Sequence, residues 1–279
     1  MTDAYDALYQ RALGGLRSAG MDEGLIRREW FAPQPLLIIC GAGHVARELA
    51  QMAALLEMRV KVIDDRPEFA NEARFPAAKV VCAPFERIGE QLEGGAYYVV
   101  ATRGHQEDYR CAKAILASPH SYLGIIGSRG KAAATLARLQ EDGFTKEQTD
   151  GICTPIGLDI GAQTPAEIAV SILAQIIGVK NARGASFVPR EMAEAQEPGM
   201  LVIIIGKHGS APRGVGSMML VSGGRVVGTI GGGAVEHAAI RDARAASGAM
   251  IREYALSSAQ GAALGMICGG RCTVLFIPV

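Results

Sequence analysis

The first half of the chain alternates short apolar runs with longer segments whose apolar positions recur every three or four residues. The short runs predict buried strands, and the longer segments predict helices that pack on them. Strands that alternate with helices are typical of a mostly parallel sheet covered on both faces. The predicted strands are residues 36–40, 59–63, 80–81, 98–101 and 122–126, and the predicted helices are 45–56, 108–116 and 131–140.

Two further helices are predicted outside this alternation. Residues 3–17 place their apolar side chains on one helical face, so they predict an amphipathic helix that packs against a domain or a partner. Another helix is expected to begin at Pro165, because Thr164 can cap its free N–H groups and Glu167 can complete a capping box. We expect Gly178 to end that helix.

The last 80 or so residues have a different pattern. Strands are predicted at 200–205, 218–221, 226–230 and 273–277, with one helix at 235–246 and glycine-rich turns at 209–216, 231–233 and 268–270. The predicted fold class is α/β, a Rossmann-like parallel sheet domain followed by a smaller α/β domain. The predicted divisions are an N-terminal helical extension (1–32), the Rossmann-like domain (33–180), a linker (181–198) and the glycine-rich domain (199–279).

Composition narrows the class of protein. With 279 residues, 49% of them hydrophobic, the chain is long enough for two domains with buried cores. The 28 basic residues balance 28 acidic ones without a basic block, which argues against nucleic-acid binding. The apolar runs are too short to span a membrane, and the N-terminus does not resemble a secretory signal. Six scattered cysteines are then expected as free thiols in the cytoplasm.

The segment from Gly41 to Ala46 follows a predicted strand and opens a predicted helix. Gly41 and Gly43 permit the tight turn and close backbone approach that a dinucleotide pyrophosphate requires, and Asp64 ends the next strand, where it can accept from a ribose hydroxyl. His44 either contacts a phosphate or is a solvated loop residue. Alternatively, the glycines only pack helix against strand.

Two later segments should lie on the same carboxyl edge of the sheet. Arg103 follows the fourth predicted strand, and Ser128 and Arg129 follow the fifth. Ser128 can cap the next helix while Arg129 supplies positive charge, so an anion can be held there. A capped helix with solvated basic side chains explains the same residues.

The glycine-rich turns of the second domain offer anion donors and thiols. Ser210 and Arg213 place a hydroxyl and a guanidinium in one loop, and Gly232 and Gly233 precede a helix. Cys268 is followed by Gly269, Gly270 and Arg271, so its thiolate can be exposed and acidified, suited to a soft metal or to carrying sulfur. Alternatively, these glycine-rich segments are only tight turns and bind no ligand.

Several of these motifs together resemble the XdhC/CoxI family, the accessory proteins of molybdenum hydroxylases. The resemblance covers most of residues 35–279, and the strings Pro-Ile-Gly-Leu-Asp-Ile-Gly-Ala (155–162) and Cys-Gly-Gly (268–270) are its most specific parts. The other segments that carry it are 41–46, 62–66, 103–105, 123–131, 209–213, 228–236 and 266–267.

The resemblance implies a function. Such a protein binds molybdenum cofactor (molybdopterin) transiently, protects it during sulfuration, and delivers it to a xanthine dehydrogenase-type molybdenum hydroxylase. Interaction with a cysteine desulfurase and a homodimer are also implied. In this reading Cys268 is a molybdenum ligand or sulfur contact, the Ser210–Arg213 loop holds the pterin phosphate, and Glu236 accepts from a pterin N–H. The chain would be a chaperone without catalytic residues.

Two departures from the family's pattern leave alternatives open. The two domains stand in reversed order, and Ala234 occupies a position that often carries a cysteine, which puts a two-thiol mechanism in doubt. An NAD(P)-dependent oxidoreductase using Gly41, Gly43 and Asp64 is one alternative, with His105 as its proton donor. The other is a redox sensor in which the Rossmann-like domain binds a nucleotide and Cys268 reacts with oxidant.

Overall fold

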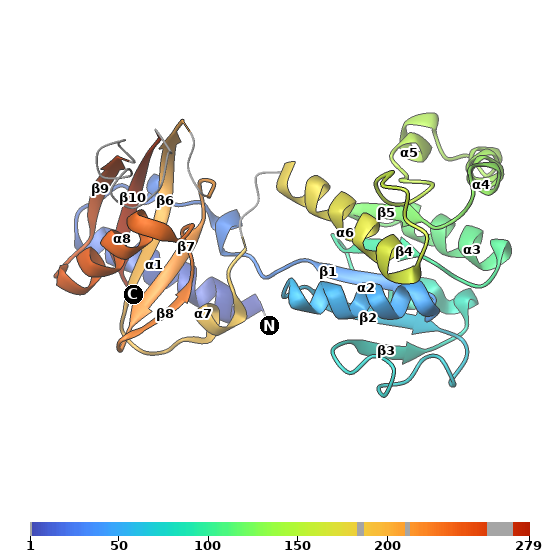
Figure 1. The fold of residues 1–279 in the computed structure, drawn as a ribbon, viewed down its shortest axis with the longest axis horizontal. Helices are drawn as coiled ribbons and strands as arrows, with labels where there is room; N and C mark the ends of the chain where they lie inside the picture. Colours follow the sequence, from blue (N-terminus) through green and yellow to red (C-terminus); the bar gives the residue numbers. More distant parts are fainter. Residues whose placement is uncertain (1, 183–186, 210–212, 256–269) are drawn as a thin grey trace. The chain divides into compact units, whose positions relative to one another are not determined.

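The computed structural model describes residues 2–182, 187–209, 213–255 and 270–279. The chain folds into two compact units (Figure 1). One unit is continuous, Pro35–Arg183, and the other combines Met1–Gln34 with Gly184–Val279. The N-terminal residues that the pattern sets apart as an extension therefore belong to the same unit as the end of the sequence.

The continuous unit is built on a five-stranded sheet of order β3-β2-β1-β4-β5. Every strand pairs in parallel with its neighbour, which confirms the predicted Rossmann-like parallel sheet. The central strand is continuously apolar because helices cover both of its faces. The strands are β1 (Leu36–Cys40), β2 (Arg59–Asp64), β3 (Lys79–Cys82), β4 (Tyr97–Val100) and β5 (Tyr122–Ile125).

Alternate residues of β1 enter two different cores. Leu37 and Ile39 pack with side chains of α2 (His44–Leu55) and α6 (Pro165–Ala182). Ile38 packs on the opposite face with α3 (His105–Leu116), α4 (Arg129–Glu141) and the 3-10 segment η3 (Phe85–Gln91). Each such buried Leu or Ile stabilises the fold by about 1.5–3 kcal/mol relative to exposure. A short helix, α5 (Lys146–Asp150), completes the unit.

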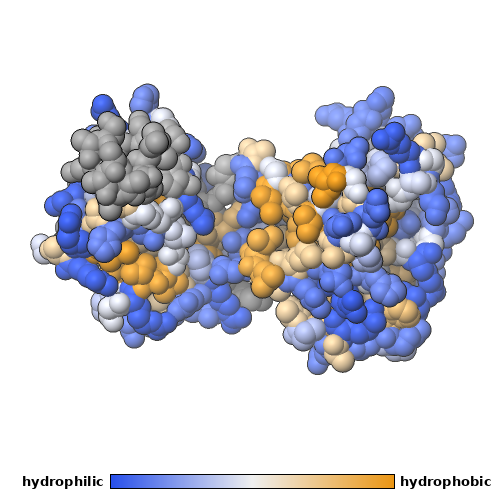
Figure 2. All heavy atoms as spheres, viewed as in Figure 1, coloured by the Kyte–Doolittle hydropathy of each residue, from blue (hydrophilic) through white to orange (hydrophobic). Residues whose placement is uncertain are grey.

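The start of α6 matches its prediction and the end does not. Glu167 N donates to Thr164 Oγ1 at 3.3 Å, and Thr164 N donates to Glu167 Oε2 at 2.9 Å, so the capping box is confirmed. The helix passes Gly178 and runs to Ala182. A glycine in a helix costs only about 1 kcal/mol relative to alanine, and Val179 packs against the core beyond it. Apolar side chains also reach the surface over α6 (Figure 2).

The discontinuous unit holds a five-stranded antiparallel sheet of order β8-β7-β6-β10-β9. Four of its strands confirm predicted ones, but β9 lies where no strand is expected. It is an edge strand whose side chains are mostly exposed, so it lacks an apolar run. The strands are β6 (Met200–His208), β7 (Met218–Ser222), β8 (Arg225–Gly228), β9 (Met250–Ala255) and β10 (Arg271–Pro278).

Helices cover both faces of this second sheet. The predicted amphipathic helix, α1 (Thr2–Ser18), buries Leu8 and Leu16 against Leu201 and Ile277. Helix α8 (Gly233–Ala245) packs on the other face. The remaining elements are η1 (Glu23–Leu25), η2 (Arg28–Phe31) and α7 (Arg190–Glu194). Among the described residues, no helix is long and apolar enough to cross a membrane.

Candidate functional site

The carboxyl edge of the parallel sheet has its topological switch point beside β1. Strands β2 and β3 lie on one side of β1 and β4 and β5 lie on the other, the position where such sheets hold ligands. Gly41 directly follows β1 with a φ of +110°, and a Cβ there would lie 2.2 Å from the carbonyl oxygen of Ala101. Only glycine fits this close approach between the loops after β1 and β4.

The rest of the glycine turn is open. Gly43 is the N-cap of α2 and makes no side-chain capping bond, and a Cβ built on it meets nothing within 4 Å. His44 begins the helix and is exposed. The helix N-terminus can therefore be approached by an anion, as the sequence suggests.

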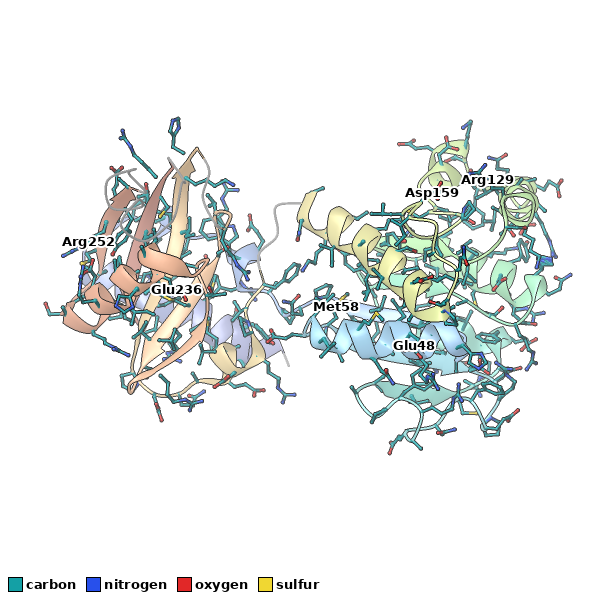
Figure 3. All side chains as sticks on the ribbon, viewed as in Figure 1. Glu48, Met58, Arg129, Asp159, Glu236 and Arg252 are labelled. Atoms are coloured by element: carbon teal, nitrogen blue, oxygen red, sulfur yellow. The ribbon has the colours of Figure 1, made fainter. Side chains whose placement is uncertain are left out.

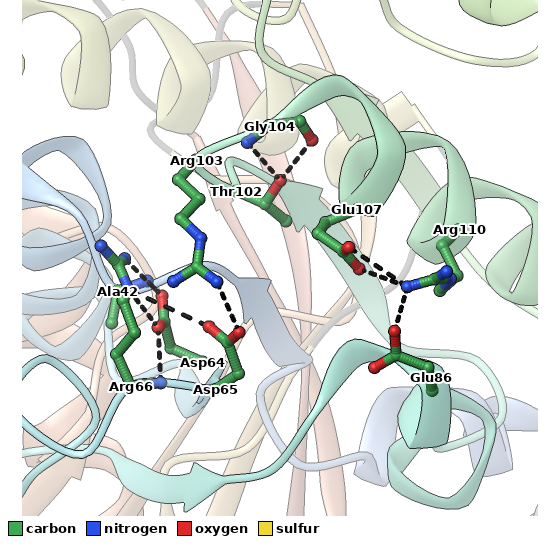
Figure 4. A network of polar contacts seen from close by, with 10 residues as sticks. All are labelled: Ala42, Asp64, Asp65, Arg66, Glu86, Thr102, Arg103, Gly104, Glu107 and Arg110. Carbon is green, nitrogen blue, oxygen red and sulfur yellow. Dashed lines mark hydrogen bonds and ion pairs between the residues drawn. The ribbon is translucent and has the colours of Figure 1, made fainter.

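Asp64 lies at the end of β2 with 1% of its surface exposed. Its carboxylate accepts from Ala42 N at 2.8 Å, from Arg66 N at 3.1 Å, and from the Arg66 side chain at 2.8 and 2.9 Å (Figure 4). Burial acts to raise the pKa of Asp64, but the hydrogen bonds from Arg66 and Ala42 outweigh it and hold that pKa below its ordinary value. Asp64 thus stays charged and fastens the glycine turn to β2.

The next residue, Asp65, joins the loops after β2 and β4. Its Oδ2 accepts from Arg103 Nη2 at 2.8 Å (Figure 4). Because β1 lies between β2 and β4, this ion pair spans the carboxyl end of β1. Arg103, which the sequence proposes as an anion contact, is half exposed and is held in place by Asp65.

A second acid, half-buried, stands in the first turn of α3. Asp108 Oδ1 accepts from Thr102 Oγ1 at 2.6 Å and from Thr102 N at 3.1 Å. Burial raises the pKa of Asp108, although the bonds from Thr102 oppose the rise. The predicted proton donor, His105, is exposed at the start of the same helix. This acid holds the loop after β4 and is a residue that the sequence reasoning missed.

The turn after β5 is only partly as expected. Ser128 occupies the N-cap position of α4, but its hydroxyl makes no capping hydrogen bond. Arg129 follows it as the first residue of the helix and is exposed (Figure 3). Because its hydroxyl is not committed to the helix, Ser128 is left with its bonding capacity for another partner.

In the antiparallel unit, the predicted glycine turn is ordered around Glu236 of α8 (Figure 3). Gly231, Gly232 and Gly233 all have positive φ. Glu236 Oε2 accepts from Ile230 N at 2.9 Å, from Gly232 N at 3.1 Å and from the Thr229 hydroxyl. Burial acts to raise the pKa of Glu236, but these bonds outweigh it and lower the pKa.

The thiol and phosphate loops are partly outside the described residues. Ser210, Cys268 and Gly269 lie there, so their predicted roles stay predictions. Arg213 is exposed, and Gly270 is buried just before β10. Within the described part of the chain, no group of three or more His, Cys, Asp or Glu side chains is placed to hold a metal ion.

The predicted residues therefore form two groups. Gly41, Gly43, His44, Asp64, Arg103, Ser128 and Arg129 lie on the carboxyl edge of the parallel sheet, whereas Arg213, Gly232, Gly233, Glu236 and Gly270 belong to the antiparallel unit. The sequence reasoning missed Arg66 and Arg74 beside the first group. Asp65 and Arg66 follow Asp64 directly, so a charged run after a buried strand was the available signal for Arg66, but it does not extend to Arg74.

Comparison with known proteins gives matches over both units. Residues 37–176 match the family model described as the XdhC Rossmann domain, and residues 192–255 match the model described as the XdhC and CoxI family. The domain order predicted from the sequence, Rossmann domain first, is confirmed by these matches.

Relatives match only part of their own length. An Escherichia coli (strain K12) protein named "Uncharacterized protein YqeB" is 31% identical over 199 residues, which is 70% of this chain and 36% of that protein. A Bacillus subtilis (strain 168) protein, named as a probable subunit of xanthine dehydrogenase, is 33% identical over 148 residues, 52% of this chain and 43% of that one. A Bacillus halodurans crystal structure titled as a xanthine dehydrogenase is 28% identical, with a TM-score of 0.48 and coverage of 60% and 46%.

Proposed function

This chain belongs to the XdhC and CoxI family, and from that membership we propose that it binds molybdenum cofactor, assists its sulfuration, and delivers it to a xanthine dehydrogenase-type molybdenum hydroxylase. The names of two relatives support an association with xanthine dehydrogenase. The chain spans less than half the length of the relatives it matches, so the client enzyme is part of the proposal.

The observation that carries the proposal is a basic end on the β6–β10 pair. Arg271 lies opposite His208 in the antiparallel register, and both are exposed. Gly270 connects Arg271 to the turn that contains Cys268. The cargo carries an anionic phosphate and an anionic dithiolene, so the exposed guanidinium of Arg271, which follows Cys268 by three residues in the sequence, is chemically suited to it.

Arg213, exposed in the loop between β6 and β7, adds a second guanidinium for the phosphate. The donor set of this unit therefore fits the cargo.

The glycine turn before α8, residues 231–233, has a supporting role in this proposal. Its amide N–H groups at Ile230 and Gly232 bond Glu236, and that of Gly231 bonds Thr229 Oγ1 at 3.0 Å. Glu236 thus fixes the turn, and Gly232, the N-cap residue of α8, provides no side-chain capping bond. We place an oxygen of the cargo at this helix N-terminus.

Cys268 is the thiol that we propose as molybdenum ligand or sulfur contact, with a cysteine desulfurase as the sulfur source. Since Ala234, in the first turn of α8, has no thiol, a second cysteine is not part of the scheme. Association of two copies belongs to the same proposal.

The test is molybdenum retention. The purified 279-residue chain is mixed with freshly released molybdenum cofactor, desalted and assayed for metal, beside Cys268→Ala and, as a matched thiol control, Cys82→Ala, which changes an exposed cysteine of the other unit. We expect about one molybdenum per chain in the wild type and in Cys82→Ala, and little in Cys268→Ala. Equal retention in all three chains, or retention in none, would overturn the assignment.

A further inference from the structure

Exposed apolar side chains are concentrated in one short segment of the parallel unit. Leu158 is 49% exposed, Ile160 54% and Val170 48%, so three of the eight exposed large hydrophobic residues in the described part of the chain fall within thirteen positions. Single exposed apolar residues are common on protein surfaces, whereas a group of them marks an interaction site. Leu158 and Ile160 lie in the loop between α5 and α6, and Val170 lies in α6.

The loop is fastened to α6 before its tip. Gly157 N donates to Gln175 Oε1 at 3.0 Å, and Leu158 N donates to the carbonyl oxygen of Ser171 at 3.2 Å. Gly157 has a φ of +95°, and a Cβ there would lie 2.4 Å from Ser171 Oγ, so the loop and the helix are in close contact. Since Ser171 directly follows Val170, these bonds place the backbone of Leu158 beside the exposed part of α6.

The loop is also fastened after its tip. Gln163 N and Thr164 N both donate to Glu167 Oε2, at 2.8 and 2.9 Å. The tip, residues 159–162, is thus held between two segments that are both bonded to α6. A segment that already has its bound conformation loses little conformational entropy when a partner covers it. The loop therefore presents Ile160 from a preorganised backbone.

The charge of this loop has one sign. Asp159, between the two exposed apolar side chains, has no hydrogen-bond or ion-pair partner among the described residues (Figure 3). Between Lys146 and Lys180 the sequence has four acidic residues and no lysine or arginine. A surface complementary to the loop therefore combines an apolar pocket with lysine or arginine side chains at its rim.

These features fit a protein partner better than a small ligand. Small molecules bind in concave sites, whereas here the apolar side chains are exposed on a loop and on a helix. Delivery of a cofactor also requires contact with the receiving enzyme. We propose that residues 155–162 and Val170 dock this chain on the hydroxylase that receives the cofactor, with Leu158 and Ile160 in an apolar pocket and Asp159 paired with a basic side chain at its rim. This inference rests on the proposed function.

Surface plasmon resonance with the cofactor-free hydroxylase of the same organism tests the proposal. The double variant Leu158→Ser/Ile160→Ser should bind at least about 30-fold more weakly, because apolar anchors at the centre of an interface carry most of its affinity. Asp159→Lys should bind about tenfold more weakly, and its affinity should no longer fall as ionic strength rises, as that of the wild type does. The control, Leu55→Ser, changes a leucine that is 85% exposed elsewhere on the same unit and should leave the affinity unchanged.

Molybdenum retention separates this proposal from that of the cargo site, since both loop variants should retain the metal as the wild type does. A wild type that retains molybdenum without binding the hydroxylase would overturn the docking alone. Circular dichroism checks folding, and Asp159→Lys serves alone if the double variant is unfolded. Unchanged affinity in the folded variants, or an equal loss in Leu55→Ser, would also overturn the docking. So would a changed oligomeric state of the loop variants in sedimentation velocity, which would assign the loop to a second copy of this chain.

Discussion

Arg66 binds Asp64 through two parallel hydrogen bonds, Nε to Oδ1 at 2.8 Å and Nη2 to Oδ2 at 2.9 Å. This fork geometry is the strongest arrangement for a guanidinium and a carboxylate. It neutralises an acid whose side chain is 1% exposed, at the point where the glycine turn meets β2. The pair therefore supports the backbone on which any ligand at this edge depends.

Arg66→Ala should destabilise the parallel unit by about 2–3 kcal/mol, because it leaves the buried charge of Asp64 short of partners. The two units can be followed separately: the one tryptophan of the sequence, Trp30, lies in the antiparallel unit, whereas far-ultraviolet circular dichroism reports both. In the variant, the dichroism signal should begin to fall at a lower urea concentration than in the wild type. The midpoint of the Trp30 fluorescence transition should stay the same. Arg103→Ala, which removes a half-exposed pair, should change stability by at most about 1 kcal/mol.

Gly41→Ala and Gly43→Ala should separate two uses of glycine in one turn. At Gly41 the positive φ and the 2.2 Å approach to Ala101 make alanine costly, roughly 2–4 kcal/mol. At Gly43, φ is −72° and the added methyl meets open space, so the cost should stay below about 1 kcal/mol. Urea unfolding followed by circular dichroism measures both, and equal losses would contradict this account of the turn.

The stability of the antiparallel unit should fall in acid through Glu236. Its pKa is lowered in the folded chain, so its contribution is complete above the ordinary value of 4.5 and is lost as pH falls from there through the folded pKa. Glu236→Gln should make the pH dependence of the Trp30 transition shallower below pH 4.5. Glu253→Gln, on the exposed edge strand β9, is the control and should leave that slope as it is.

Replacing either of two leucines of α2 by alanine should affect the stability of the fold very differently. Leu49 is fully buried and Leu55 is 85% exposed. Leu49→Ala should cost about 2–5 kcal/mol through lost burial and a cavity, whereas Leu55→Ala should lie within about 0.5 kcal/mol of the wild type. Comparable urea midpoints for the two variants would mean that Leu55 is covered in solution.

The sequence predicts the centre of the parallel sheet well because β1 and β4 are buried on both faces and form unbroken apolar runs. It does not predict β9, whose edge position leaves Arg252 and Glu253 exposed. Gly178 misleads for a different reason. A local preference for ending the helix is outweighed by the packing of Val179 beyond it, which only the tertiary structure reveals.

The candidate site is predicted less completely. Gly41, Gly43 and Asp64 are recognisable because their spacing follows from strand, turn and helix. Their partners are not: Arg74 reaches the turn from 32 residues along the chain, and nothing in the local pattern marks it. Asp64 shows the same limit, since its position is predicted correctly while its bonds to Arg66 depend on how the following loop folds back.

The packing of α1 on β10 has a consequence for the order of folding. A Cβ on Gly15 would lie 2.3 Å from the carbonyl oxygen of Pro278, so the helix and the strand are in intimate contact although they stand at opposite ends of the sequence. During synthesis, residues 35–183 can close their own core while α1 still lacks its strand. We therefore expect the parallel unit, which is inserted in the sequence of the other unit, to fold first, and the unit that carries the Cys268 turn to be completed only after β10 has been synthesised.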